Sequence, residues 1–107
     1  MSGGGTASLI DREHLDRQTM GDAGLAGELL AMFVEQLDAA LLRLQGADAA
    51  ERGAIAHSLK GTARSLGVWK IAACADALEG QAQAGSRISE LRALACELAA
   101  EIAIPSG

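Results

Sequence analysis

Apolar residues recur at intervals of three and four through most of this chain, which is the spacing of one face of an α-helix. The clearest stripe consists of Leu25, Leu29, Phe33, Leu37, Ala40, Leu41 and Leu44. Shorter stripes follow at Ile71, Ala75, Leu78 and Ala82, and at Ile88, Leu91, Ala95, Leu98 and Ile102. The chain offers little for a sheet, because Ala and Leu dominate it and it contains one Phe, one Trp and no Tyr. We therefore expect an all-α fold.

Glycines and capping residues divide the chain into helical segments. The predicted segments are residues 11–20, 22–45, 48–66, 68–84 and 86–104. The expected N-caps are Asp22, Asp48 and Ser86, and the expected stops are Gly21, Gly46, Gly67, Gly85 and Pro105. Four substantial helices joined by short turns predict an up-down antiparallel four-helix bundle with a short extra N-terminal helix. Residues 1–8 are expected to be a flexible leader, and residues 9–105 the bundle domain.

Charge and composition exclude several classes of function. The net charge is −5 and no cluster of Lys and Arg is present, so binding to nucleic acid is not expected. No apolar run approaches the roughly 20 residues that span a bilayer, and the N-terminus lacks the features of a signal peptide. We expect a cytoplasmic protein. Its cysteines, Cys74 and Cys96, are predicted to be reduced and packed in the core on facing helices, with no metal site.

The segment 48–66 carries the most specific pattern. On a helical wheel, Ile55, Leu59, Thr62 and Leu66 form the predicted buried face. The opposite, solvent-facing side of the wheel contains His57, Lys60, Gly61 and Arg64. The helical period alone therefore places one imidazole, two cations and a glycine together on the surface.

This exposed group of residues is suited to phosphoryl chemistry. An imidazole in water is largely unprotonated at pH 7 and can act as a nucleophile. Gly61, one turn after His57, presents no side chain to an approaching partner, although glycine in a helix interior costs about 1 kcal/mol relative to Ala. Lys60 and Arg64 offer charge to offset a phosphoryl group on the ring.

The twelve residues 56–67, AHSLKGTARSLG, resemble the signature of histidine-containing phosphotransfer (HPt) domains. The pair Leu78-Glu79 resembles the Leu-Glu pair that this family carries about twenty residues downstream, and the resemblance extends from about Leu9 to Ile104. It implies that His57 accepts the phosphoryl group and that Lys60 and Gly61 border it at the docking surface. Ser58, Arg64 and Ser65 are the further residues expected to contact a partner.

The resemblance also implies the partners and the reaction. The phosphoryl group would pass from the aspartyl phosphate of one response-regulator receiver domain to His57, and then to another receiver, in a phosphorelay that includes a hybrid sensor histidine kinase. The receiver would supply Mg²⁺, so no cofactor is expected in this chain. The domain would be a phosphocarrier, not an enzyme with kinase activity, and a monomer.

Several residues have more than one interpretation. Arg64 stands where the family commonly has a small residue; it would contact phosphate or an acidic receiver surface, or it is simply a solvated charge. His14 is expected to be a surface residue, not a second phosphate site, and Trp69 to pack against a neighbouring helix end. Glu79 is predicted to lie at the surface, where it would cap a helix or pair locally.

Three other functions compete with the phosphocarrier. The dimerisation domain of a sensor kinase also presents His on a bundle, but it typically has an acidic residue after the His and Pro five residues on, where this chain has Ser58 and Thr62. Without an acidic neighbour of His57, the sequence shows no evident base for autophosphorylation. A helical interaction module in which His57 is inert is the second alternative. A metal or haem bundle is the third, and it would need inward-facing ligands.

Overall fold

The computed structural model describes residues 8–81 and 83–103, and these ranges contain five α-helices and no strand. The helices are α1 (Arg12–Gln18), α2 (Ala23–Leu44), α3 (Ala49–Leu66), α4 (Trp69–Glu79) and α5 (Ala84–Ala103). The all-α class predicted from composition and periodicity is therefore confirmed for the described part of the chain.

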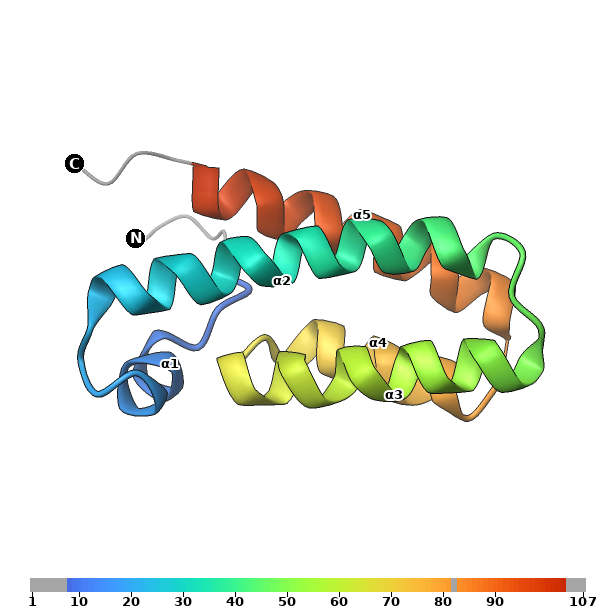
Figure 1. The fold of residues 1–107 in the computed structure, drawn as a ribbon, viewed down its shortest axis with the longest axis horizontal. Coiled ribbons are helices and arrows are strands. Elements are labelled where there is room, and N and C mark those ends of the chain that lie inside the picture. Colours follow the sequence, from blue (N-terminus) through green and yellow to red (C-terminus); the bar gives the residue numbers. More distant parts are fainter. Residues whose placement is uncertain (1–7, 82, 104–107) are drawn as a thin grey trace, which may run out of the picture.

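Each long helix packs against two others around a common core. Figure 1 shows α2 and α5 together on one side of the molecule and α3 and α4 on the other, with α1 crossing the end at the start of α2. The closest association is between α3 and α4, and α4 also packs on α5 while α2 packs on both α3 and α5. The middle of α3 is thus supported from two sides and faces solvent on the remaining side.

Aspartate side chains cap three of the helices, and they include two of the predicted N-caps, Asp22 and Asp48. Asp22 accepts a hydrogen bond from the backbone N–H of Leu25 at 2.9 Å, and Asp48 accepts one from Glu51 at 2.8 Å. Asp11 does the same for α1. Each bond satisfies an N–H that has no partner within its helix.

The core consists of aliphatic side chains and one aromatic ring. Its largest fully buried side chains are Phe33, Leu37, Leu59, Val68, Ile71, Leu78, Leu91 and Leu98. The stripe predicted for α2 is confirmed from Phe33 onward, but Leu25 is 40% exposed and Leu30 is buried in its place. A spacing of four advances the face by about 40° at each step, so Leu25 is rotated by roughly 120° from Leu37.

The boundary between the last two helices differs from the prediction. We expected a helix to continue to Ala84 and Ser86 to cap the next one, but α4 ends at Glu79 and Ser86 lies inside α5. Gln81 adopts a left-handed φ of 67° after the helix end. Its side chain is held by α3: it accepts from Arg52 Nε and donates to the carbonyl of Ala49, both at 3.0 Å. α4 thus ends with Gly80 as its C-cap, short of the predicted end, and contacts across the bundle hold the residue that follows.

The two cysteines do not share an environment. Cys74 is buried in α4, as expected, and burial together with the nearby Glu90 carboxylate raises the pKa of its thiol to about 11. Cys96 is exposed on α5, so the prediction that both thiols are core residues is wrong for Cys96. Both are free thiols.

The ends of the described chain lie side by side. Of the expected leader only Ser8 is described; its hydroxyl donates to Glu101, and the N–H of Leu9 donates to the same carboxylate at 2.9 Å. Pro105, the expected stop of the last helix, lies outside the described residues. None of the described helices is long and apolar enough to cross a membrane.

A left-handed turn at Gly67 joins α3 to α4. Gly67 has a φ of 77°, and the N–H of Val68 donates to the carbonyl of Ala63 at 2.9 Å, which closes the end of α3. A Cβ at this position would lie 3.1 Å from the backbone oxygen of Asp11 and 3.2 Å from the His14 ring. Glycine is therefore required at position 67 for two reasons: the backbone has a positive φ, and there is no room for a Cβ.

We predict opposite stability effects for two glycine substitutions in the same helix region. Gly67→Ala should lower the free energy of unfolding by about 1–3 kcal/mol, because alanine is strained at positive φ and meets Asp11. Gly61→Ala should raise it by roughly 0.5–1 kcal/mol, because Gly61 is helical and a Cβ there meets nothing within 4 Å. Urea unfolding of both variants checks this, and a loss of stability in Gly61→Ala would contradict it.

Candidate functional site

The imidazole of His57 projects into solvent from the middle of α3. Its side chain is 71% exposed, while Ala56 and Leu59 on either side of it in the sequence are fully buried. The buried neighbours fix the rotation of the helix, so the outward direction of His57 follows from the packing. The predicted position of the ring is confirmed.

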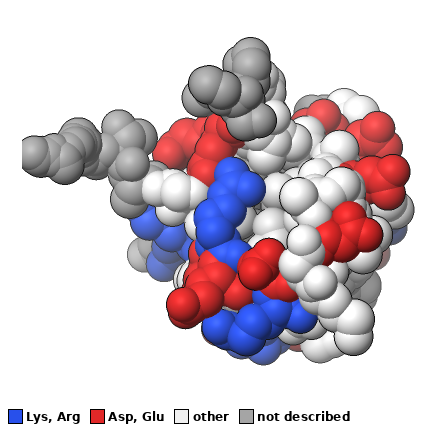
Figure 2. All heavy atoms as spheres, turned by 90° about the vertical axis from the view of Figure 1, so that its left-hand side faces the viewer, with Lys and Arg blue, Asp and Glu red and all other residues white. Residues whose placement is uncertain are grey.

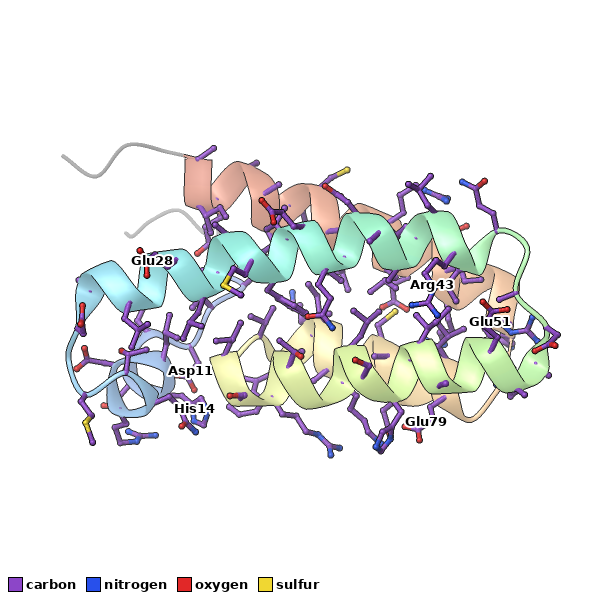
Figure 3. All side chains as sticks on the ribbon, in the orientation of Figure 1. Asp11, His14, Glu28, Arg43, Glu51 and Glu79 are labelled. Atoms are coloured by element: carbon purple, nitrogen blue, oxygen red, sulfur yellow. The ribbon has the colours of Figure 1, made fainter. Side chains whose placement is uncertain are left out.

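A carboxylate from α4 holds one nitrogen of this ring. Nδ1 of His57 lies 2.9 Å from Oε2 of Glu79, which Figure 3 shows on the side of α3 that is turned away from α2. An ionised carboxylate can only accept a hydrogen bond, so Nδ1 carries the proton and donates. In the neutral ring the lone pair is then on Nε2. The arrangement fixes both the tautomer and the orientation of the nucleophilic nitrogen.

Lys60 does not lie free on the solvent side as the helical wheel predicts. Its side chain is only 15% exposed, and Nζ lies 2.5 Å from Oε1 of Glu79 and 3.3 Å from Oδ1 of Asp76. The wheel position of Lys60 is at the edge of the predicted exposed face, and α4 packs over that edge. The buried face of α3 is therefore rotated towards Lys60 relative to the predicted one. As a result Ala56 and Ala63 are buried, and Thr62 is only half-buried.

The three side chains influence one another electrostatically. The ammonium group of Lys60 and the ring of His57 lower the pKa of the Glu79 carboxyl from its ordinary value. Glu79 and Asp76 raise the pKa of Lys60. Glu79 therefore remains ionised, and able to accept from His57, over the whole neutral range.

Glu79 is the member of the candidate site that the sequence interpretation missed. It is predicted to cap a helix or pair locally, but it contacts His57 and Lys60 of another helix, and it supplies the acidic neighbour of His57 that Ser58 does not. The position of Glu79 beside His57 could have been predicted by aligning α3 and α4 as an antiparallel helical hairpin about Val68. His57 lies eleven residues before Val68 and Glu79 eleven after it; Lys60 lies eight before and Asp76 eight after. Both cross-helix pairs obey one antiparallel register centred on the turn.

The face of α3 beside His57 is open. A Cβ at Gly61 would meet nothing within 4 Å, so this position is unobstructed as predicted. Ser58, Arg64 and Ser65 are exposed on the same helix. Ser58 also accepts a hydrogen bond from Gln36 of α2 at 3.4 Å, which ties the open face to the neighbouring helix.

His14 and Trp69 belong to a separate, structural cluster. Their rings meet edge to face with centroids 4.9 Å apart, and the indole N–H of Trp69 donates to Asp11 at 2.9 Å. Nε2 of His14 lies 3.2 Å from the carbonyl oxygen of Ser65, which can only accept, so this nitrogen donates. The packing role predicted for Trp69 is confirmed. His14 is half-buried and serves to hold α1 against the end of α3.

The charged surface at the α1 end is mixed. Figure 2 shows Lys and Arg side chains directly beside Asp and Glu side chains there, with no broad area of one sign. One contributor is the ion pair between Arg12 and Glu101 at 3.6 Å. Within residues 8–81 and 83–103, no group of three or more His, Cys, Asp and Glu side chains is arranged to hold a metal ion.

We predict that Glu79 stabilises the fold in a pH-dependent way. Because its pKa is lowered in the folded state, its contribution is present above the ordinary glutamate pKa and is lost as the pH falls through the lowered value. The destabilisation caused by Glu79→Gln should therefore be largest at pH 7 and shrink towards pH 3. Urea unfolding at several pH values measures it. Glu97→Gln, at an exposed glutamate of α5, is the control, and an effect of Glu79→Gln that does not change with pH would refute the ion-pair account.

Comparison with known families identifies the chain. A family model described as the Hpt domain matches residues 28–104, which include His57, the paired Glu79 and nearly all of the helices except α1. Comparisons with curated proteins and with solved structures gave no match. The family match covers more than half of the sequence and agrees with the exposed histidine in the middle of a packed helix. The chain belongs to the Hpt domain family.

Proposed function

We propose that this Hpt domain is a phosphocarrier of a two-component phosphorelay, which accepts a phosphoryl group on Nε2 of His57 from the aspartyl phosphate of one receiver domain and passes it to another. The observation that carries the proposal is the 2.9 Å contact between Nδ1 of His57 and Glu79 on a ring that is 71% exposed. It presents Nε2 as an oriented nucleophile to a partner in solution.

The transfer step balances with the groups present. The lone pair of Nε2 attacks phosphorus, the P–O bond of the acyl phosphate breaks, and the aspartate leaves as a carboxylate with that electron pair. The proton on Nδ1 stays in place, so the phosphorylated ring carries positive charge, which the adjacent Glu79 carboxylate offsets. Transfer to the second receiver is the reverse step. We propose that the receiver binds the Mg²⁺, and that this chain contributes the nucleophile, its orientation and a docking surface.

Other residues of α3 take supporting roles in this proposal. Ser58, Gly61 and Ser65, named here the docking strip, are exposed beside His57 and offer small side chains to an approaching receiver. Lys60 acts by holding Glu79 in position, since its ammonium group is 2.5 Å from that carboxylate. The domain would comprise residues 9–105 as a monomer, and the packing of α2–α5 on one another favours the up-down four-helix arrangement. A hybrid sensor histidine kinase would be one source of the donor receiver.

Replacing the nucleophile tests the proposal directly. His57→Gln removes the imidazole and with it the proposed nucleophile Nε2, so it should abolish acid-labile phosphoryl label after incubation with phosphorylated receiver domains. The wild-type protein is expected to acquire one label per chain. His14→Gln is the matched control and should label like the wild type, because His14 lies in the separate cluster with Trp69. Undiminished labelling of His57→Gln would sink the proposal, because another residue would then carry the phosphoryl group; a wild-type protein that takes no label would favour the helical interaction module.

A bulkier residue at Gly61 tests the need for an open approach. Gly61→Gln should reduce transfer from a receiver by at least about tenfold, because its side chain occupies the docking strip, while the helix itself gains propensity. Labelling by the small donor phosphoramidate, which attaches a phosphoryl group without a protein partner, should be preserved. Rapid-quench rates with both donors separate the two effects. Equal transfer rates from the receiver in the variant and the wild type would show that the glycine has no docking role.

A further inference from the structure

We propose that Arg64 is the residue of this chain that binds an acidic group on the surface of the receiver, and that it thereby determines which receivers dock productively. This inference rests on the proposed phosphocarrier function and concerns the same face of α3. It assigns Arg64 to recognition of the partner protein, not to contact with the phosphoryl group.

The first argument is that the other cation near His57 is already occupied. Lys60 lies between two carboxylates, 2.5 Å from Glu79 and 3.3 Å from Asp76, with its side chain 15% exposed. Arg64 is exposed and makes no side-chain hydrogen bond or ion pair with any residue in the described ranges. On the face of α3 that carries His57, the positive charge offered to an incoming molecule is therefore that of Arg64.

The second argument concerns distance along the helix. Arg64 follows His57 by seven residues, which places the two on the same face about 10.5 Å apart along the axis. Helical side chains lean towards the N-terminus, so that of Arg64 is directed back along α3 towards His57, yet a Cβ at Gly61 would still meet nothing within 4 Å. A protein that approaches His57 over Gly61 would therefore also meet Arg64. This position suits a contact with the body of the docked protein.

The third argument is electrostatic. A receiver that holds Mg²⁺ next to an acceptor aspartate must present carboxylates around that site, because oxygen ligands bind this hard cation. The present chain carries a net charge of −5, so a carboxylate-rich site on the receiver approaches a chain of the same sign. A guanidinium group binds a carboxylate with two parallel hydrogen bonds and offsets that repulsion where the surfaces meet.

The test compares two substitutions that change the net charge equally. Arg64→Gln is compared with Arg92→Gln as the control. Arg92 is an exposed residue of α5, and it lines the groove between α2 and α5 together with Leu42 and Cys96. The probe is a phosphorylated receiver domain that labels the wild-type protein, and initial transfer rates are measured against receiver concentration. We expect Arg64→Gln to raise KM by about three- to tenfold with unchanged kcat. Arg92→Gln should leave both constants unchanged, and Arg64→Lys should restore part of the loss.

Two further readouts separate the possible outcomes. Added NaCl should raise the KM of the wild type more than that of Arg64→Gln, because one screened ion pair is missing from the variant. Labelling by phosphoramidate should be the same in both. A lower kcat or slower phosphoramidate labelling in Arg64→Gln would overturn the proposal, since Arg64 would then act on the phosphoryl group. Equal effects of Arg64→Gln and Arg92→Gln, or none from either, would also overturn it.

Failure of the underlying function looks different from failure of this inference. If the domain were not a phosphocarrier, the wild-type protein would take no label from any receiver. If only the role of Arg64 were wrong, label would pass to His57 with the same KM in the wild type and in Arg64→Gln.

Discussion

α3 and α4 are joined by one left-handed residue, Gly67, and this turn determines what lies beside the exposed imidazole. The turn reverses the chain within two residues, so α4 returns along α3 in a single antiparallel register. That register brings Glu79 to His57 and Asp76 to Lys60. The orientation of the His57 ring therefore depends on a backbone angle ten residues away from it. Closing the end of α3 also brings α1 into contact with it, through Asp11 and His14.

The ionic cluster explains why an exposed histidine can be held in one orientation. A surface side chain normally samples several rotamers, and an isolated surface ion pair contributes little to stability. Here the carboxylate of Glu79 is itself held by Lys60, whose side chain lies largely under α4. The hydrogen bond to Nδ1 thus has a fixed partner, and Nε2 keeps its direction without being buried.

Local signals in the sequence were sufficient for most of the helices and for the direction of His57. Asp22, Asp48 and Gly67 act through bonds within a few residues of themselves, and such bonds can be predicted from spacing. What could not be predicted depends on neighbouring helices. Gln81 bonds to α3 directly after the end of α4, and Cys96 lines an open groove between α2 and α5 instead of the core.

Lys60 shows the limit of a helical wheel most clearly. The wheel reports the direction of a side chain from its own helix axis, and it contains no information about which flank the next helix covers. The family resemblance had the same limit, because it placed Lys60 at the docking surface without indicating that Glu79 and Asp76 would pair with it. The contacts of Glu79 and of Lys60 both follow from the side of α3 on which α4 packs. Once that side is known, the antiparallel register of α3 and α4 predicts both contacts.

The two faces of α3 have different roles. One face supplies buried residues such as Leu59 and Ala63 to the core, and it carries the stability of the helix. The other face is therefore free to hold residues that the packing does not require, including the interior glycine at position 61 and the arginine at position 64, which has no ion pair within the described residues. The glycine lowers helix stability, and the arginine has no partner in the core. Both are accounted for if a second protein covers this face during transfer, since a glycine lets it approach closely and an arginine gives it a charge to bind.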